Sequence, residues 1–190
     1  MPGYNKQQGF SLLELVIVII LISLLIVIAI DRLLVLRVEA ERVSVEKLAG
    51  ELRSAMSITV ASKVASDGGL QNVYKLHKSN PMELLAETPG AYIGEISDAD
   101  QANIAAGNWY FDTDEGALVY KVINRDNLVT ELEGPKRIRF QLQLVYSDKN
   151  HNRRYDVGHD SVQGMRLKAL DKYHWQLDKN VEDIAGELKP

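Results

Sequence analysis

Residues 9–30 read GFSLLELVIVIILISLLIVIAI, and this stretch decides how the chain is organised. From Phe10 to Ile30 the only ionisable side chain is Glu14. A helix of this length rises about 1.5 Å per residue and is about 30 Å long, which matches the hydrocarbon core of a bilayer. The sequence therefore predicts a membrane-spanning helix near the amino terminus.

The leader before this helix, residues 1–9, is short and polar and contains Lys6. An ordinary secretory signal is cut after its apolar run at a site of the A-x-A kind, and that pattern does not follow this run. Positive charge in the leader favours a cytoplasmic amino end and an outer carboxyl part, although Arg32 and Arg37 beyond the span weaken this rule. We expect a single-pass protein of the inner membrane with its amino terminus in the cytoplasm.

The amino-acid composition limits the number of domains and the classes of function that the chain can have. The chain has 190 residues, a net charge of −4, no cysteine and 46% hydrophobic residues, which suits one domain plus one extra element. The acidic balance disfavours a nucleic-acid partner, and the lack of cysteine excludes disulfides and thiolate chemistry. The sequence has no G-x-S-x-G, Walker, H-E-x-x-H or G-x-G-x-x-G motif, so we do not expect an enzyme.

The motif GFSLLE at residues 9–14, followed at once by the apolar run, resembles the leader of type IV prepilins, the precursors of pilins and pseudopilins. The resemblance implies that a prepilin peptidase cuts after Gly9 and methylates the new terminal amine of Phe10. It also implies partners: other pilin or pseudopilin subunits and an inner-membrane assembly platform. A plain membrane anchor with an interfacial Glu14 is the alternative.

Glu14 has a physical reason to be functional. A carboxylate inside a bilayer costs about 2.5–3.5 kcal/mol on insertion scales, so it needs a partner. In the resembled family the partner is the terminal amine of a neighbouring subunit, here Phe10, and this pair would set the stagger of subunits. Major pilins often have a glycine and a proline within the span, where this chain has Ser23 and Asp31. Together with the lack of cysteine, this favours a minor pilin or a type II secretion-like pseudopilin, and the choice between them stays open.

Beyond the span, apolar residues recur every three or four positions with charged residues between them, which predicts an amphipathic helix. The apolar positions are Val38, Val45, Leu48, Leu52, Ala55, Met56 and Val60. No proline interrupts the chain from Phe10 to Ser66, and Gly68-Gly69 follows. We expect one helix about 85 Å long, with a membrane or filament-core part at 10–36 and an amphipathic part at 37–66. A coiled-coil dimer is the alternative use of the apolar face.

Residues 67–190 are predicted to form a periplasmic or extracellular head. A connecting region at 70–108 contains a short helix at 82–86, begun by Asn80-Pro81. Alternating or aromatic segments predict strands, and these are 108–111, 117–123, 138–146, 162–170 and 173–177. The expected fold class is α+β, in which one long amino-terminal helix packs on an antiparallel sheet, as in the pilin fold. Residues 178–190 are predicted to be a polar tail or a short helix.

The segment DKNHNRRYDVGHD at 148–160 follows the clearest strand and resembles an EF-hand calcium loop. Its spacing predicts oxygen ligands at Asp148, Asn150, Asn152 and Asp156, the backbone carbonyl of Arg154, and Asp160 in place of the usual terminal glutamate. The sixth position is Arg153 rather than glycine, and the twelfth is His159. An asparagine- and aspartate-rich turn, or a zinc site using the histidines, are the alternatives.

These features predict a structural subunit of a type IV pilus or of a type II secretion-like pseudopilus. Such a subunit starts in the inner membrane and is then packed into the filament. The alternative is a calcium-dependent surface-binding module, a minor pilin or adhesin displayed at the filament tip.

Overall fold

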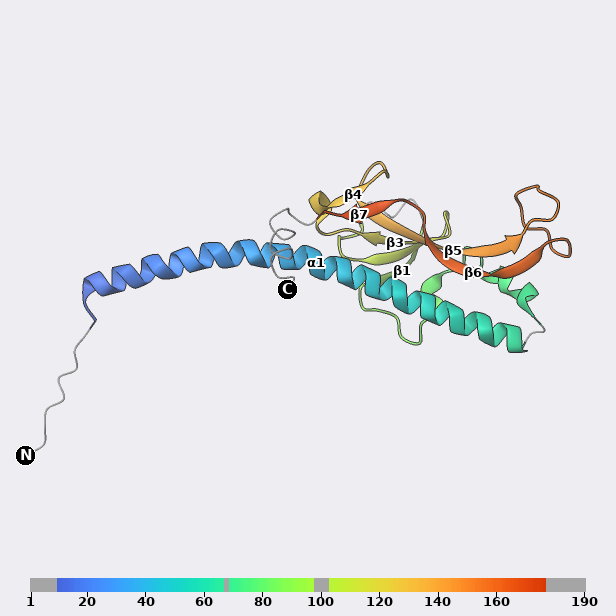
Figure 1. The fold of residues 1–190 in the computed structure, drawn as a ribbon, viewed down its shortest axis with the longest axis horizontal. Helices are drawn as coiled ribbons and strands as arrows, with labels where there is room; N and C mark the ends of the chain where they lie inside the picture. Colours follow the sequence, from blue (N-terminus) through green and yellow to red (C-terminus); the bar gives the residue numbers. More distant parts are fainter. Residues whose placement is uncertain (1–9, 67–68, 98–102, 177–190) are drawn as a thin grey trace, which may run out of the picture. The chain divides into compact units, whose positions relative to one another are not determined.

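The structure is a computed structural model that describes residues 10–66, 69–97 and 103–176. The chain divides into two compact units, one formed by Met1–Ala40 with Asp178–Pro190 and the other by Glu41–Leu177. The α-helix α1, Leu12–Ser66, is 55 residues long and continues from the first unit into the second (Figure 1). The prediction of one uninterrupted helix is confirmed.

In the second unit α1 supplies one side of the hydrophobic core. Val45, Leu48, Leu52 and Met56 are buried, and Leu52 is fully enclosed. These residues follow one another at spacings of three and four, so they lie on one face of the helix. The apolar stripe predicted from the sequence is therefore the face that α1 turns towards the sheet.

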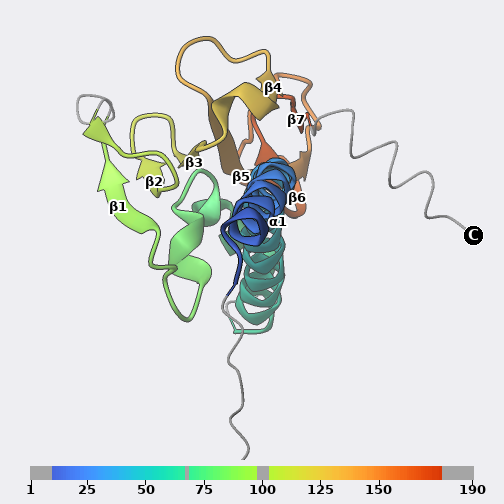
Figure 2. The ribbon, with the colours of Figure 1, turned by 90° about the vertical axis from the view of Figure 1, so that its left-hand side faces the viewer.

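The main sheet has five strands in the order β1-β2-β3-β5-β6. Their bounds are β1 Tyr92–Ile96, β2 Trp109–Asp112, β3 Ala117–Lys121, β5 Arg137–Ser147 and β6 Ser161–Ala169. All neighbouring strands are antiparallel except β1 and β2, which are parallel. The α+β class is confirmed, with the difference that the sheet is mixed, because β1 adds to the edge of the antiparallel hairpins. In Figure 2 β1 lies at the side of the sheet away from α1.

A second sheet pairs two short strands, β4 (Leu128–Thr130) and β7 (Tyr173–Trp175). Among the described residues, 3-10 helices connect the elements at η1 (Leu70–Leu76), η2 (Pro81–Leu84) and η4 (Arg125–Asn127). Asn80 caps η2, because its side-chain oxygen accepts a hydrogen bond from Met82 N at 3.0 Å. The short helix expected at 82–86 thus exists one residue earlier and as a 3-10 helix.

The predicted inward face of β5 is confirmed. Ile138, Phe140, Leu142 and Leu144 are buried and lie on one face of the strand, although Gln141 on the other face is buried as well. Aromatic rings extend this core, since the Trp109 ring lies 4.8 Å from Tyr120 and 6.1 Å from Phe140 between centroids. The aromatic segment at 108–111 is therefore sheet core and not a ligand platform.

Candidate functional site

Ser11 caps the start of α1. Ser11 Oγ accepts a hydrogen bond from Glu14 N at 3.2 Å, and Ser11 O accepts one from Leu15 N at 3.1 Å. A serine followed three residues later by a glutamate is the capping-box pattern, and a carboxylate in the first turn also interacts favourably with the helix dipole. The spacing of Ser11 and Glu14 in the sequence is the signal from which this cap could be predicted.

The expected processing site lies directly before this cap. Phe10 is non-helical and 77% exposed, one residue ahead of Ser11, whereas Gly9 lies outside the described residues. A peptide bond next to a capped helix start leaves the helix intact when it is cut, because the capping hydrogen bonds begin at Ser11. The local geometry is therefore compatible with a new terminus at Phe10.

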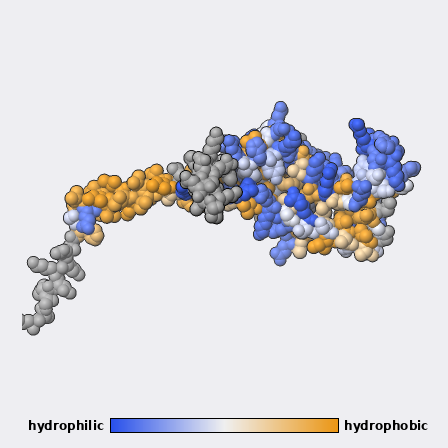
Figure 3. Space-filling model, viewed as in Figure 1, coloured by the Kyte–Doolittle hydropathy of each residue, from blue (hydrophilic) through white to orange (hydrophobic). Residues whose placement is uncertain are grey.

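No other described part of the chain covers the apolar side chains in the first part of α1. Every large hydrophobic side chain from Leu12 to Ile30 is exposed, at 38–81% of its full area, and this part is coloured as hydrophobic in Figure 3. An 18-residue window of α1 has a mean hydropathy of 3.4 with none of it buried, so α1 is long and apolar enough to cross a membrane. Ser23 Oγ donates to Ile19 O at 2.8 Å, which satisfies this polar side chain within the helix.

Glu14 is the exception in this apolar surface. Its carboxylate is exposed and makes no hydrogen bond or ion pair with any residue that the structure describes. A carboxylate inside a bilayer costs about 2.5–3.5 kcal/mol on insertion scales, so Glu14 is the candidate functional residue of this apolar helix.

A second glutamate, Glu41, anchors α1 in the second unit and was not predicted. It is 7% exposed, and its carboxylate accepts four hydrogen bonds. The donors are Tyr120 Oη at 2.9 Å, Ile123 N at 2.6 Å, Asn124 N at 2.9 Å and Asn124 Nδ2 at 2.6 Å. Burial raises the pKa of the Tyr120 phenol, and the adjacent Glu41 charge raises it further, so the phenol stays a donor. Glu41 therefore fastens the helix to the end of β3.

The candidate calcium loop lies between β5 and β6. Asp156 Oδ2 accepts hydrogen bonds from Asn150 Nδ2 at 2.7 Å and Asn152 Nδ2 at 2.6 Å, so the structure brings these three predicted ligands together. Asp148 instead accepts bonds from the backbone of Asn152 at 3.3 Å and of Arg153 at 2.7 Å. Hydrogen bonds that aspartate and asparagine side chains make within the loop hold it in this arrangement.

Asp160 closes the loop by joining its two ends. Its carboxylate accepts hydrogen bonds from Lys149 N at 3.0 Å and Asp156 N at 2.9 Å, and it is buried. The Lys149 bond, followed by the Asp156 bond, lowers the pKa of Asp160, because both stabilise its charged form. The oxygen-rich donor set suits calcium. In residues 10–66, 69–97 and 103–176, however, no three His, Cys, Asp or Glu side chains are grouped so that they could hold a metal. Calcium binding stays a prediction.

The backbone at the sixth loop position is informative. Arg153 has a φ of 63°, in the left-handed region that EF-hand loops reach with glycine at this position. The Arg154 N–H donates to Asn152 Oδ1 at 2.7 Å, which continues the tight turn towards the seventh position. His151 also has a left-handed backbone, with a φ of 59°, so the loop contains two such turns among non-glycine residues.

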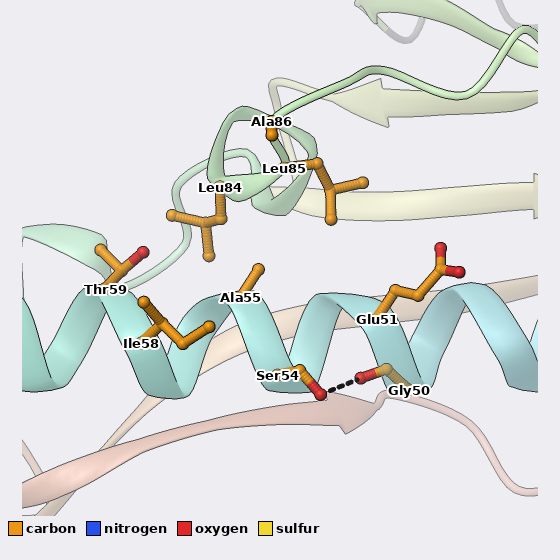
Figure 4. A pocket seen from close by; sticks show the side chains of 9 residues that line it. All are labelled: Gly50, Glu51, Ser54, Ala55, Ile58, Thr59, Leu84, Leu85 and Ala86. Carbon is orange, nitrogen blue, oxygen red and sulfur yellow. Dashed lines mark hydrogen bonds between the residues drawn. The ribbon is translucent and has the colours of Figure 1, made fainter.

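An apolar groove of about 640 Å³ lies between α1 and the residues after η2 (Figure 4). One wall comes from α1 at Gly50, Ala55 and Ile58, and the other from Leu84 and Leu85. Ile58 is 71% exposed, so the groove is open to solvent along the helix. Glu51, Ser54 and Thr59 are its polar lining residues, and Ser54 Oγ donates a hydrogen bond within the helix to Gly50 O at 3.1 Å (Figure 4).

Comparison with known families gives one match. The model for the prokaryotic N-terminal methylation motif matches residues 4–30, which include the leader, the capped helix start and the exposed apolar helix. No curated protein and no solved structure matches the chain. The chain thus carries a type IV pilin-like prepilin leader, which points to a structural subunit associated with a membrane rather than to an enzyme.

Proposed function

We propose that this protein is a structural subunit of a type IV pilus or of a type II secretion-like pseudopilus. Prepilin peptidase cleaves it after Gly9 and methylates the amine of Phe10, and the helix at 10–36 then packs in the filament core. The observation that carries the proposal is the methylation motif at residues 4–30, which ends in an exposed apolar helix with a single carboxylate.

Glu14 sets the register of subunits in this proposal. Its carboxylate lacks a partner among the described residues, and the methylated amine of Phe10 in the next subunit is a cation of the right kind. Pairing offsets the cost of taking both charges out of water, and a one-turn error in stagger leaves both unpaired. A buried ion pair is best attested in this role of fixing register.

The leader, the apolar helix and the head each have a proposed location relative to the inner membrane. The leader at 1–9 stays in the cytoplasm, the helix at 10–36 crosses the inner membrane, and residues 37–190 lie in the periplasm. The assembly platform then moves the helix from lipid into the filament, where contacts with other apolar helices replace contacts with lipid. The uninterrupted α1, with Ser23 bonded inside the helix, favours a minor pilin or a pseudopilin over an elastic major pilin.

Leader processing is the experiment that tests the proposal. We expect mass spectrometry of the chain co-expressed with a prepilin peptidase to find a protein that begins at Phe10 and carries one added methyl group. Gly9→Val should remain full-length, because a Cβ obstructs close approach of the peptidase to the scissile bond. Gly3→Val is the matched control and should be processed normally. A wild-type chain that keeps its leader in the presence of an active peptidase contradicts the proposal.

A second function is a calcium-dependent surface-binding module at a filament tip. The left-handed backbone of Arg153 at the sixth loop position and the approach of Asn150 and Asn152 to Asp156 favour it. Rotation of the two side-chain amides would turn their oxygens towards Asp156, in exchange for the hydrogen bonds that Asn152 N and Arg154 N donate to those oxygens in this structure. Such a loop, with few carboxylates, suits calcium at extracellular concentrations of about 0.1–1 mM.

A further inference from the structure

A hollow of about 410 Å³ lies beside the loop at 148–160, and Leu144 is its one lining residue that belongs to the buried apolar residues. Its volume falls in the range of about 300–1,000 Å³ that is typical of small-ligand sites. The residues that give it its chemistry are Tyr74, Tyr146 and Tyr155, two adjacent arginines at Arg153 and Arg154, and His77. They come from η1, β5 and the loop.

One wall of the hollow is fixed by the backbone. The segment after η1 docks on β5, where Lys78 N donates to Leu142 O at 2.9 Å. His77 Nδ1 lies 3.2 Å from Leu142 O and 3.3 Å from Leu144 N, which places the imidazole against the same strand. The wall therefore exists before any ligand arrives, and preformed walls are typical of small-molecule sites.

Three tyrosine rings line the hollow. The Tyr155 ring lies 5.8 Å from that of Tyr74, with an angle of 34° between planes, and 5.5 Å from that of Tyr146, at 66°. All three are half-buried, and none belongs to the buried core clusters. Core packing thus does not account for this aromatic group, whose rings combine an apolar face with a polar hydroxyl.

The two arginines add positive charge at the same place. Both are exposed, and their guanidinium groups bond to no residue that the structure describes. Neither arginine side chain bonds to the acids of the same loop, since Asp148 accepts bonds from backbone amides and Asp156 from asparagine side chains. Arg153 has a φ of 63°, so the turn holds a bulky residue in the left-handed region that favours glycine.

We propose that this hollow binds a carboxylated sugar ring of an acidic polysaccharide. The tyrosine faces pack against the apolar face of the ring, and an arginine fork holds the carboxylate through two parallel hydrogen bonds. A neutral sugar leaves the arginines unused. A nucleic acid needs a basic track along several nucleotides, whereas this chain has a net charge of −4 and two arginines at one hollow.

The inference concerns the head and does not require that the loop bind calcium or that the chain enter a filament. Its failure would leave processing at Gly9 and assembly through Glu14 untouched, and these have separate readouts. The binding test uses the full chain in detergent micelles, with EDTA present because uronic acids chelate calcium themselves.

Isothermal titration calorimetry measures binding of oligosaccharides of uronic acids, with neutral oligosaccharides of the same length and single-stranded DNA as comparisons. We expect saturable binding of the uronates only. Arg153→Ala with Arg154→Ala should weaken it at least about tenfold, and the corresponding double lysine variant should recover only part of the loss, because lysine lacks the planar fork. Arg125→Ala, at an exposed site in η4, is the matched control and should bind normally.

Substitutions of Tyr74 test the contribution of the tyrosine rings that line the hollow. Tyr74→Phe should keep most of the affinity because the ring remains, whereas Tyr74→Ala should lose several-fold. Thermal unfolding of each variant checks that the fold is kept. The proposal is overturned if wild type does not bind uronates, or if it binds neutral sugars or DNA equally well. Unchanged affinity in the double alanine variant overturns it too.

Discussion

Glu41 is the residue on which the attachment of the helix to the sheet depends most. Its four donors lie 79 to 83 positions away along the chain, so no local pattern in the sequence marks it. Glu14 could be found from the sequence because a charge in an apolar run stands out. Glu41 could not, because it looks like any charged residue of an amphipathic helix.

Replacement of Glu41 should therefore be costly. We expect Glu41→Ala to lower the free energy of unfolding by about 3 kcal/mol, because it removes charge-assisted hydrogen bonds and leaves Ile123 N and Asn124 N without their acceptor. Glu46→Ala is the matched control. Glu46 pairs with Arg42 at the helix surface, 2.9 Å away, and such a pair contributes about 0.5 kcal/mol or less. Chemical denaturation of the full chain in micelles measures both, and equal losses would contradict the anchoring role of Glu41.

Two carboxylates of the loop at 148–160 test the prediction of calcium binding. With a dissociation constant of about 0.1–1 mM, millimolar calcium should stabilise the fold by about 1–2 kcal/mol and raise the melting temperature by a few degrees. Asp148→Ala with Asp156→Ala should abolish this shift, whatever its effect on the calcium-free melting temperature. Asp126→Ala with Glu133→Ala removes two exposed acids elsewhere in the head and should keep the shift. Absence of any shift in wild type would eliminate calcium.

The elements differ in how well the sequence predicts them. Periodic segments were predicted well: α1 from its stripe and β5 from its alternation. The strands β1 and β4 were missed. The strand β4 has three residues, and β1 has five, with Gly94 at a φ of 109° in its middle. Such strands exist because a neighbouring strand offers hydrogen bonds, and their own pattern is too short to predict them.

The stripe on α1 makes a quantitative prediction. Leu52 is fully buried against the sheet, so Leu52→Ala should lower the free energy of unfolding by about 2–5 kcal/mol through lost burial and the cavity left behind. Ile58 is a residue of the same helix that is 71% exposed, and Ile58→Ala should change stability by about 0.5 kcal/mol or less. Denaturant titration of both variants in micelles compares them. A loss at Leu52 no larger than at Ile58 would contradict the assignment of the buried face.

For the whole molecule, similarity to a known motif is found in the amino-terminal part and not in the head. The methylation motif at residues 4–30 identifies the leader, and no solved structure or curated protein resembles the complete chain. The hollow beside the loop at 148–160 joins residues from η1, β5 and the loop, which are far apart in sequence. Sequence reasoning found the loop from its spacing, but the aromatic and basic hollow emerges only when the chain is folded.

The central claim is that the exposed helix enters a filament through Glu14. The most direct measurement is the amount of this chain in filaments sheared from cells with an active assembly system, compared with the amount that remains in the membrane. Wild type should appear in the filament fraction, and Glu14→Leu should be processed at Gly9 but remain in the membrane. Ser23→Leu, which removes a polar group already bonded within the helix, should assemble normally. A Glu14→Leu chain that enters filaments at the wild-type level would contradict the account.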